Sequence, residues 1–123
     1  MAYLTDRKRA QGLGSAKSGT DHHYETQLTS AALVILIPLF VFTFGTILGQ
    51  PYEIILVYYA QPFPALVAAL TILVSMIHFR QGVQVLLEDY TRGETRHWGI
   101  MAAICVCYAL AAAGLFALAR LAL

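Results

Sequence analysis

Charged residues are scarce in this sequence. They make up 12% of its 123 residues, whereas soluble domains carry roughly 25%. Hydrophobic residues make up 59%, so the chain has too few polar groups to cover a water-facing surface. The formal net charge is +1, which gives no electrostatic reason to expect a nucleic-acid partner. These shortages exclude an ordinary soluble domain and predict one small domain in a lipid bilayer.

The sequence also lacks the motifs of an independent redox enzyme. Its two cysteines, Cys105 and Cys107, would lie about 200° apart around a helix and cannot pair with each other. No histidine or acid stands beside them, so we expect packing residues and not a metal site. A glycine-rich dinucleotide fingerprint is absent as well. This polypeptide is therefore not expected to catalyse a reaction alone.

The main feature of the sequence is three long apolar segments. They predict transmembrane helices at about 28–49, 63–89 and 98–121, each close to the ~20 residues that cross a bilayer core. A fourth apolar run, 53–61, is too short to cross, and its paired tyrosines indicate a helix lying at the membrane surface. The predicted fold class is an all-α membrane protein with a polar N-terminal tail.

The tail comprises residues 1–27 and precedes a three-helix domain at 28–123. A secretory signal would place its apolar core within a few residues of the basic start, whereas about twenty residues intervene here. We therefore expect a retained tail. Two interpretations stay open: a solvated arm held by the anionic inner membrane surface, or a segment that docks on a soluble partner.

The basic residues predict the orientation in the membrane. Cytoplasmic loops carry an excess of lysine and arginine, and here the tail and the loop between the second and third spans carry it. The N-terminus should then be cytoplasmic in a multi-pass membrane protein. The residues concerned are Arg7, Lys8, Arg9 and Lys17 in the tail, Arg92 and Arg96 in the loop, and Arg120 alone near the other end.

One stripe of the second predicted helix is small and polar. At ~100° per residue its members fall within an arc of about 80°. His78 lies about 16 Å deeper than the end of that helix, where an isolated polar ring is costly and needs a partner. The members of the stripe are Thr71, Ser75, His78, Gly82, Val85 and Asp89.

Two hypotheses for His78 stay open on this evidence. The ring can be hydrogen-bonded to a serine or a carbonyl on a neighbouring helix. Alternatively, neutral imidazole can be an axial ligand of haem iron, with Gly82 leaving room for a flat macrocycle and Ser75 on the same stripe. Arg80 points about 200° away from His78 and is not expected to share its pocket.

The end of the second span resembles a known family in its pattern of residues. The pattern consists of His78, Gly82, Asp89 and Tyr90 at their spacing in the sequence. It is similar to the D-type small anchor subunit of succinate:quinone oxidoreductase, respiratory complex II. The tail run at 12–20, followed by His22, is also similar to bacterial members. The resemblance covers essentially the whole chain in length, number of spans and topology.

The resemblance implies specific roles for three residues. His78 would be one of two axial ligands of a haem b shared with a second, cytochrome b-type anchor subunit. Tyr90 would hydrogen-bond ubiquinone, and Asp89 would support the quinone site. An iron–sulfur subunit and a flavoprotein subunit would deliver electrons from succinate, as part of the tricarboxylic acid cycle and respiratory electron transport.

Two alternatives to this function stay open. One is a haem-b anchor of a quinol:fumarate reductase, which runs the same couple in reverse. The other, from a different class, is a small membrane transporter in which His78 and Asp89 relay protons. Without the upstream histidine, Asp89 and Tyr90 would be an ordinary helix-ending acid and an interfacial tyrosine.

Overall fold

The computed structural model describes residues 5–12, 14 and 19–123, and its regular elements are all helices. Three of them, α2, α4 and α5, are long and apolar enough to cross a membrane. This confirms the predicted all-α membrane architecture, including the short helix between the first two spans. The elements are α1 (Asp6–Gln11), α2 (Gly19–Gly45), α3 (Tyr52–Tyr59), α4 (Pro62–Tyr90) and α5 (Gly93–Ala122).

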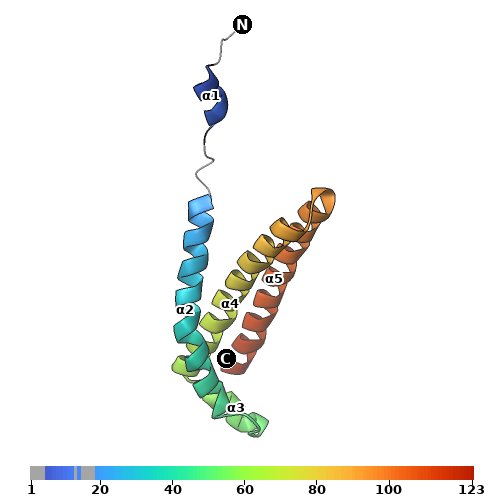
Figure 1. The fold of residues 1–123 in the computed structure, drawn as a ribbon. Coiled ribbons are helices and arrows are strands. Elements are labelled where there is room, and N and C mark those ends of the chain that lie inside the picture. Colours follow the sequence, from blue (N-terminus) through green and yellow to red (C-terminus); the bar gives the residue numbers. More distant parts are fainter. Residues whose placement is uncertain (1–4, 13, 15–18) are drawn as a thin grey trace.

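Helix α4 is the central element of the fold (Figure 1). It packs against α2 on one side and against α5 on the other, and α3 contacts both α4 and α5. Within the described part of the chain, no Cα atom of α2 lies within 8 Å of one of α5. Helix α2 converges with the α4–α5 pair near α3 and diverges from it toward the opposite end, where a short turn joins α4 to α5 (Figure 1). The arrangement is an open layer and not a closed bundle.

The long helices differ at their ends from the apolar segments that predicted them: all three begin earlier than expected, whereas α2 stops at Gly45, short of the expected 49. Helix α2 begins at Gly19, well before residue 28, and takes in part of the predicted tail. Helix α5 begins at Gly93, so the polar loop expected at 90–96 shrinks to Thr91 and Arg92. Gly93 has a φ of 62°, a left-handed value that glycine adopts readily and that allows this tight turn. Hydropathy marks the edge of the apolar segment, whereas a helix continues until its backbone is interrupted.

A small apolar core forms where the helices converge. It consists of Ile47, Tyr59, Ala68 and Leu118, from the α2–α3 loop and from α3, α4 and α5. The hydroxyl of Tyr58 donates a hydrogen bond to the backbone oxygen of Thr43 at 2.9 Å, which ties α3 to α2. Helix α3 is thus held under this end of the layer by burial and by one directional bond.

Small residues on α5 pack against α4. Cys107 and Ala111 are buried, with 2% and 7% of their surface exposed. A Cβ atom added at Gly114 would lie 3.2 Å from Cγ2 of Ile72, and one at Gly99 would lie 3.5 Å from Leu87. The small-residue ridge therefore serves close approach of two helices within this chain.

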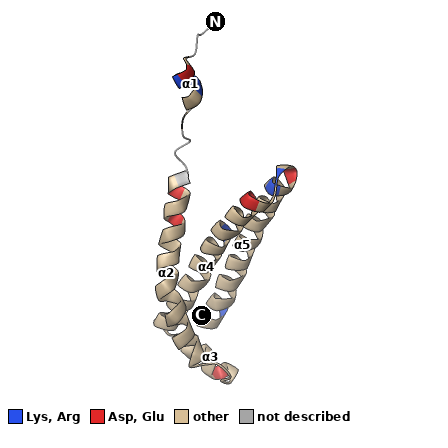
Figure 2. Cartoon of the chain, viewed as in Figure 1, with Lys and Arg blue, Asp and Glu red and all other residues tan. Residues whose placement is uncertain are grey.

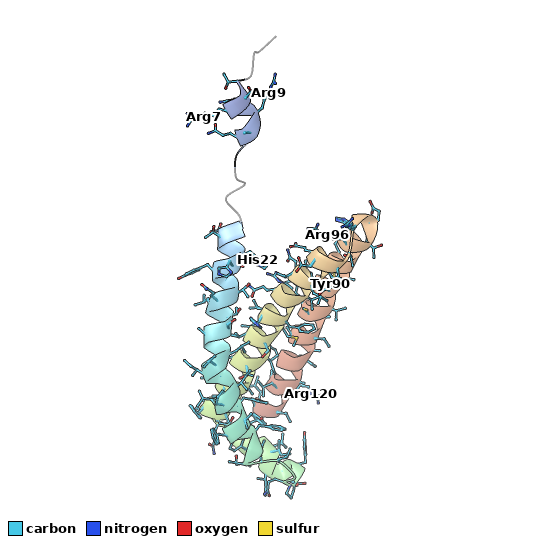
Figure 3. The ribbon with its side chains drawn as sticks, viewed as in Figure 1. Arg7, Arg9, His22, Tyr90, Arg96 and Arg120 are labelled. Carbon is cyan, nitrogen blue, oxygen red and sulfur yellow. The ribbon has the colours of Figure 1, made fainter. Side chains whose placement is uncertain are left out.

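Charged residues gather near the ends of the layer (Figure 2). Acidic and basic residues lie in α1, at the start of α2 and around the α4–α5 turn, and the middle of the helices is almost free of them. Figure 3 places His22, Tyr90 and Arg96 at this charged end and Arg120 toward the other. Arg80 is the charged residue inside the apolar length of α4.

Gly114→Leu tests the α4–α5 contact. The added side chain meets Ile72, so we expect the layer to lose about 1–3 kcal/mol of stability, as overpacked cores do. The measurement is thermal or denaturant unfolding of the detergent-solubilised protein. Ala113→Leu is the matched control because Ala113 is exposed. Equal stability of the two variants would contradict this packing.

Candidate functional site

The ring of His78 faces α2. Its Nδ1 lies 3.0 Å from the Oγ1 atom of Thr29, a residue that sequence reasoning did not single out. The same hydroxyl donates to Oε1 of Gln81 at 3.0 Å. Two helices therefore build one polar cluster, in which α4 supplies His78 and Gln81 and α2 supplies Thr29. A threonine on a neighbouring helix thus hydrogen-bonds one ring nitrogen of His78, where the first hypothesis expected a serine or a carbonyl.

Gln81 was also missed by sequence reasoning. It has 2% of its surface exposed and is the largest fully buried side chain of the described residues. A buried amide in an apolar helix needs a hydrogen-bond partner, and Thr29 provides one. The available signal was its spacing, because Gln81 follows His78 by three positions and so lies on a neighbouring part of the helix surface.

The polar stripe on α4 is covered over only part of its length. Thr71 is buried and bonds the backbone oxygen of Val67 within its own helix at 2.7 Å, and Ser75 is half-buried. Further along, Gly82 is exposed, and a Cβ added there would meet nothing within 4 Å. The stripe is therefore covered near the convergence of the helices and open where they diverge.

Asp89 and Tyr90 lie at the open end of α4. Both are exposed, Tyr90 to 83%. Neither forms a hydrogen bond or an ion pair with the residues that the structure describes. The preceding acid behaves differently: Glu88 accepts a hydrogen bond from Gln84 at 3.0 Å and lies 3.9 Å from Arg96. The carboxylate and the phenol predicted to act are thus unpaired among the residues that the structure describes.

Arg80 lies on the other side of α4 and faces α5. Its Nη1 donates to the hydroxyl of Tyr108 at 2.9 Å, and its guanidinium carbon is 5.9 Å from that ring's centroid. Its Nε is buried and has no partner among the described residues. The side chain lines a cavity of about 170 Å³ with Cys107 and Ala111. Arg80 does not join the His78 cluster, in agreement with its predicted direction.

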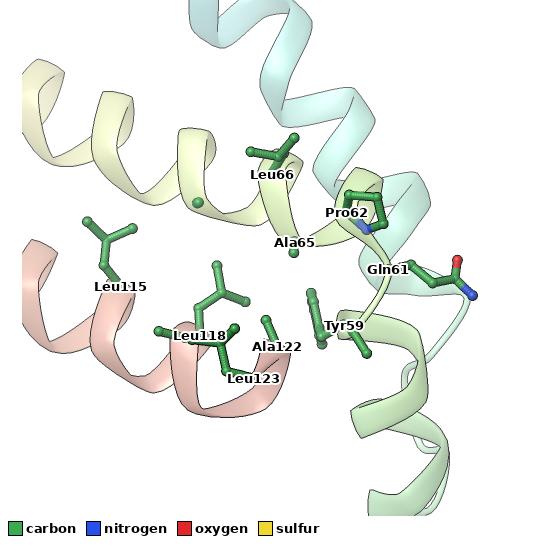
Figure 4. A pocket seen from close by; sticks show the side chains of 12 residues that line it. Tyr59, Gln61, Pro62, Ala65, Leu66, Leu115, Leu118, Ala122 and Leu123 are labelled. Atoms are coloured by element: carbon green, nitrogen blue, oxygen red, sulfur yellow. The ribbon is translucent and has the colours of Figure 1, made fainter.

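A larger groove lies at the opposite end of the molecule, between α3, α4 and the end of α5 (Figure 4). It measures about 460 Å³ and is lined mainly by apolar side chains such as Leu66, Leu115 and Leu118. Tyr59 borders it, and burial, with a smaller effect from Tyr58, raises the pKa of its phenol. The groove holds none of the residues predicted to bind a cofactor or quinone.

No group of three or more histidine, cysteine or acidic side chains in the described ranges could hold a metal ion. A single imidazole between two apolar helices could serve only as one ligand of a metal whose other ligands come from elsewhere, as in a haem. The fold and the site thus define a small multi-pass membrane protein with one buried polar cluster and one open polar end.

Comparison with known proteins gives the family. The model of the succinate dehydrogenase/fumarate reductase transmembrane subunit matches residues 1–116. The succinate dehydrogenase hydrophobic membrane anchor subunit of Paracoccus denitrificans is 42% identical over 123 residues, which is 100% of this chain and 95% of that protein. No solved structure matches significantly. The chain belongs to the family of succinate dehydrogenase/fumarate reductase transmembrane subunits, which confirms the resemblance carried by His78, Asp89 and Tyr90.

A double-mutant cycle tests the pairing of Arg80 with Tyr108. Tyr108→Phe removes the acceptor of the Arg80 hydrogen bond and should destabilise the protein by about 1 kcal/mol. In an Arg80→Met background the same change should cost little, because no donor remains. Unfolding of the four proteins in one detergent gives the coupling energy. Additive effects would show that the two side chains do not interact.

Proposed function

We propose that this chain is the membrane anchor subunit of a succinate:quinone oxidoreductase. It would supply His78 as one axial ligand of a haem b shared with a second anchor subunit, and Asp89 and Tyr90 as part of the ubiquinone site. Family membership supports the anchor role, and so does the 42% identical relative named as a succinate dehydrogenase anchor. The geometry of α4, which carries all three residues, supports their proposed roles.

The observation that carries the haem assignment is the state of the His78 ring. Its Nδ1 is hydrogen-bonded to Thr29, and its Nε2 forms no hydrogen bond with any described residue. Next along the stripe, the open space beside Gly82 leaves room for a flat ring system. These residues fit a b-type haem, which accepts and passes on one electron at a time. Ser75, half-buried on the same stripe, would line the cofactor.

The second axial ligand would come from another subunit. The remaining histidines are His22 and His23 near the start of α2 and His97 near the start of α5. His23 and His97 are exposed, and none of the three shares the hydrogen bonds of His78. A cytochrome b-type sister subunit packed on the open side of the layer would provide the missing imidazole.

Asp89 and Tyr90 suit the chemistry of quinone reduction. The quinone takes up two electrons and two protons, so its site must adjoin both water and an electron donor. The Tyr90 phenol can donate a hydrogen bond to a quinone carbonyl, and the Asp89 carboxylate can pass protons from water. Both side chains are exposed at the charged end of the layer, where such a headgroup would lie.

The same end would receive the soluble subunits. Electrons from succinate would pass through a flavoprotein and an iron–sulfur subunit to the quinone, with the N-terminal tail on the cytoplasmic side of a bacterial inner membrane. The family description names succinate dehydrogenase and fumarate reductase together, so quinol:fumarate reductase is the second candidate. A proton-relaying transporter is not supported, because Asp89 forms no hydrogen bond to the His78 cluster.

His78→Leu tests the haem role. Leucine is well accommodated in a bilayer, so the helices should still insert, whereas the iron loses one of two axial bonds. We expect the dithionite-reduced minus oxidised spectrum of the purified complex to lose most of its haem b signal. His97→Leu, at an exposed position, should keep it. Unchanged haem content and spectrum in His78→Leu would remove this residue from the site.

Tyr90→Phe tests the quinone role. The change keeps the ring and deletes one hydrogen bond, worth about 1–2 kcal/mol in a partly dry site. Quinone-dependent turnover should therefore fall roughly five- to thirtyfold. Succinate oxidation with a dye that bypasses the quinone site should be unchanged. Tyr52→Phe, at an exposed tyrosine beside the opposite end of the layer, is the control. Parallel loss of both activities would indicate misassembly, and no loss would exclude Tyr90.

A further inference from the structure

We infer that Thr29 and Gln81 are positioning residues that fix the proton of His78 on Nδ1 and so leave the lone pair of Nε2 free for a metal. The inference rests on the proposed haem role of His78 and adds two residues to it. Neither residue would touch the cofactor. They would act through the imidazole, by setting its tautomer, its orientation and its strength as a donor.

The hydrogen-bond neighbours of the Thr29 hydroxyl indicate which nitrogen of the His78 ring carries the hydrogen. Its hydroxyl lies 3.0 Å from Oε1 of Gln81, 3.1 Å from the backbone oxygen of Glu25 and 3.0 Å from that of Thr26. All three neighbours are acceptors, so they compete for the single hydroxyl hydrogen. The fourth neighbour is Nδ1 of His78 at 3.0 Å.

If Nδ1 were the bare nitrogen, it would be a fourth acceptor around one hydrogen. With the hydrogen on Nδ1, the imidazole donates to a threonine oxygen whose own hydrogen goes to one of the three oxygens. With the amide oxygen of Gln81 facing Thr29, as in the structure, the second arrangement lets the hydroxyl hydrogen go to that oxygen, whereas the first leaves it 3.0 Å from an oxygen whose hydrogen goes to Nδ1. The neutral ring then has its lone pair on Nε2, the atom that forms no hydrogen bond with the described residues.

Burial makes this arrangement persistent. Gln81 has 2% of its surface exposed, and Thr29 and His78 are half-buried between α2 and α4. Water has little access to the amide and cannot readily replace the threonine hydroxyl as its partner. The three side chains come from positions 29, 78 and 81, so the packing of α2 on α4 is what assembles them.

The electronic consequence can be measured. An imidazole that donates its Nδ1 hydrogen carries more negative charge on Nε2, which favours ferric over ferrous iron. Thr29→Val removes the acceptor while keeping the shape of the side chain. If the preference for ferric iron falls about tenfold, at the lower end of the effects known for such outer groups, the haem midpoint potential rises by about 59 mV.

The experiment is a redox titration of haem b in the purified complex, with haem content measured on the same samples. Thr29→Val should raise the potential and lower haem content, and Thr29→Ser should restore both because it keeps the hydroxyl. Gln81→Leu should shift the potential in the same direction by less, since two backbone acceptors remain. Ser30→Ala is the matched control: Ser30 is exposed, and its hydroxyl bonds only the oxygen of Thr26 on its own helix, at 2.8 Å.

The outcomes distinguish a failure of the proposed function from a failure of the positioning role alone. A wild-type complex without a haem b spectrum would overturn the proposed function. Haem b in wild type, with equal potentials in Thr29→Val and Ser30→Ala, would overturn the positioning role of Thr29 alone. If Thr29→Val loses its haem completely, Thr29→Ser decides: retained haem at the wild-type potential supports that role, and the same loss in both variants overturns it.

Discussion

The structure depends on one constraint, which is that polar side chains inside the apolar length of α4 must find partners. His78, Arg80 and Gln81 stand within a single helical turn of each other. Their side chains point to both flanks of α4, so no single neighbouring helix can satisfy all three. Thr29 on α2 meets His78 and Gln81, and Tyr108 on α5 meets Arg80. The central place of α4 follows from this division.

The same constraint explains why the layer is open. Because α2 and α5 lie along different flanks of α4, their backbones do not approach within 8 Å of each other, Cα to Cα, in the described part of the chain. Much apolar surface therefore stays exposed, including Val34, Phe42 and Phe116 at 74%, 75% and 67%. Lipid tails can cover such surface, but they offer no partner for the second nitrogen of His78. The second membrane subunit proposed above would both cover apolar surface and supply that partner.

Sequence reasoning predicted the number of spans, their order and the helix that carries the site. Hydropathy and length were enough for this, because a bilayer fixes both. It missed Thr29 and Gln81, since helical periodicity indicates which residues share a face but not which helix lies against that face. It also placed the start of α2 at residue 28, because the polar turns from Gly19 onward carry no apolar signal. The predicted roles of His78, Asp89 and Tyr90 came from family resemblance and stay predictions.

The two hypotheses for His78 were posed as alternatives, and the structure shows that they are compatible. An imidazole has two nitrogens with opposite roles in its neutral form. A hydrogen bond to a neighbouring helix uses one of them; in the proposed arrangement it would fix the hydrogen there and leave the other nitrogen free to bind iron. Without that bond, no partner would favour one tautomer of the imidazole over the other, and the ring would rotate more freely. The hydrogen bond to Thr29, which by itself suggests a structural histidine, is therefore also the kind of bond that commonly orients a metal-ligating histidine.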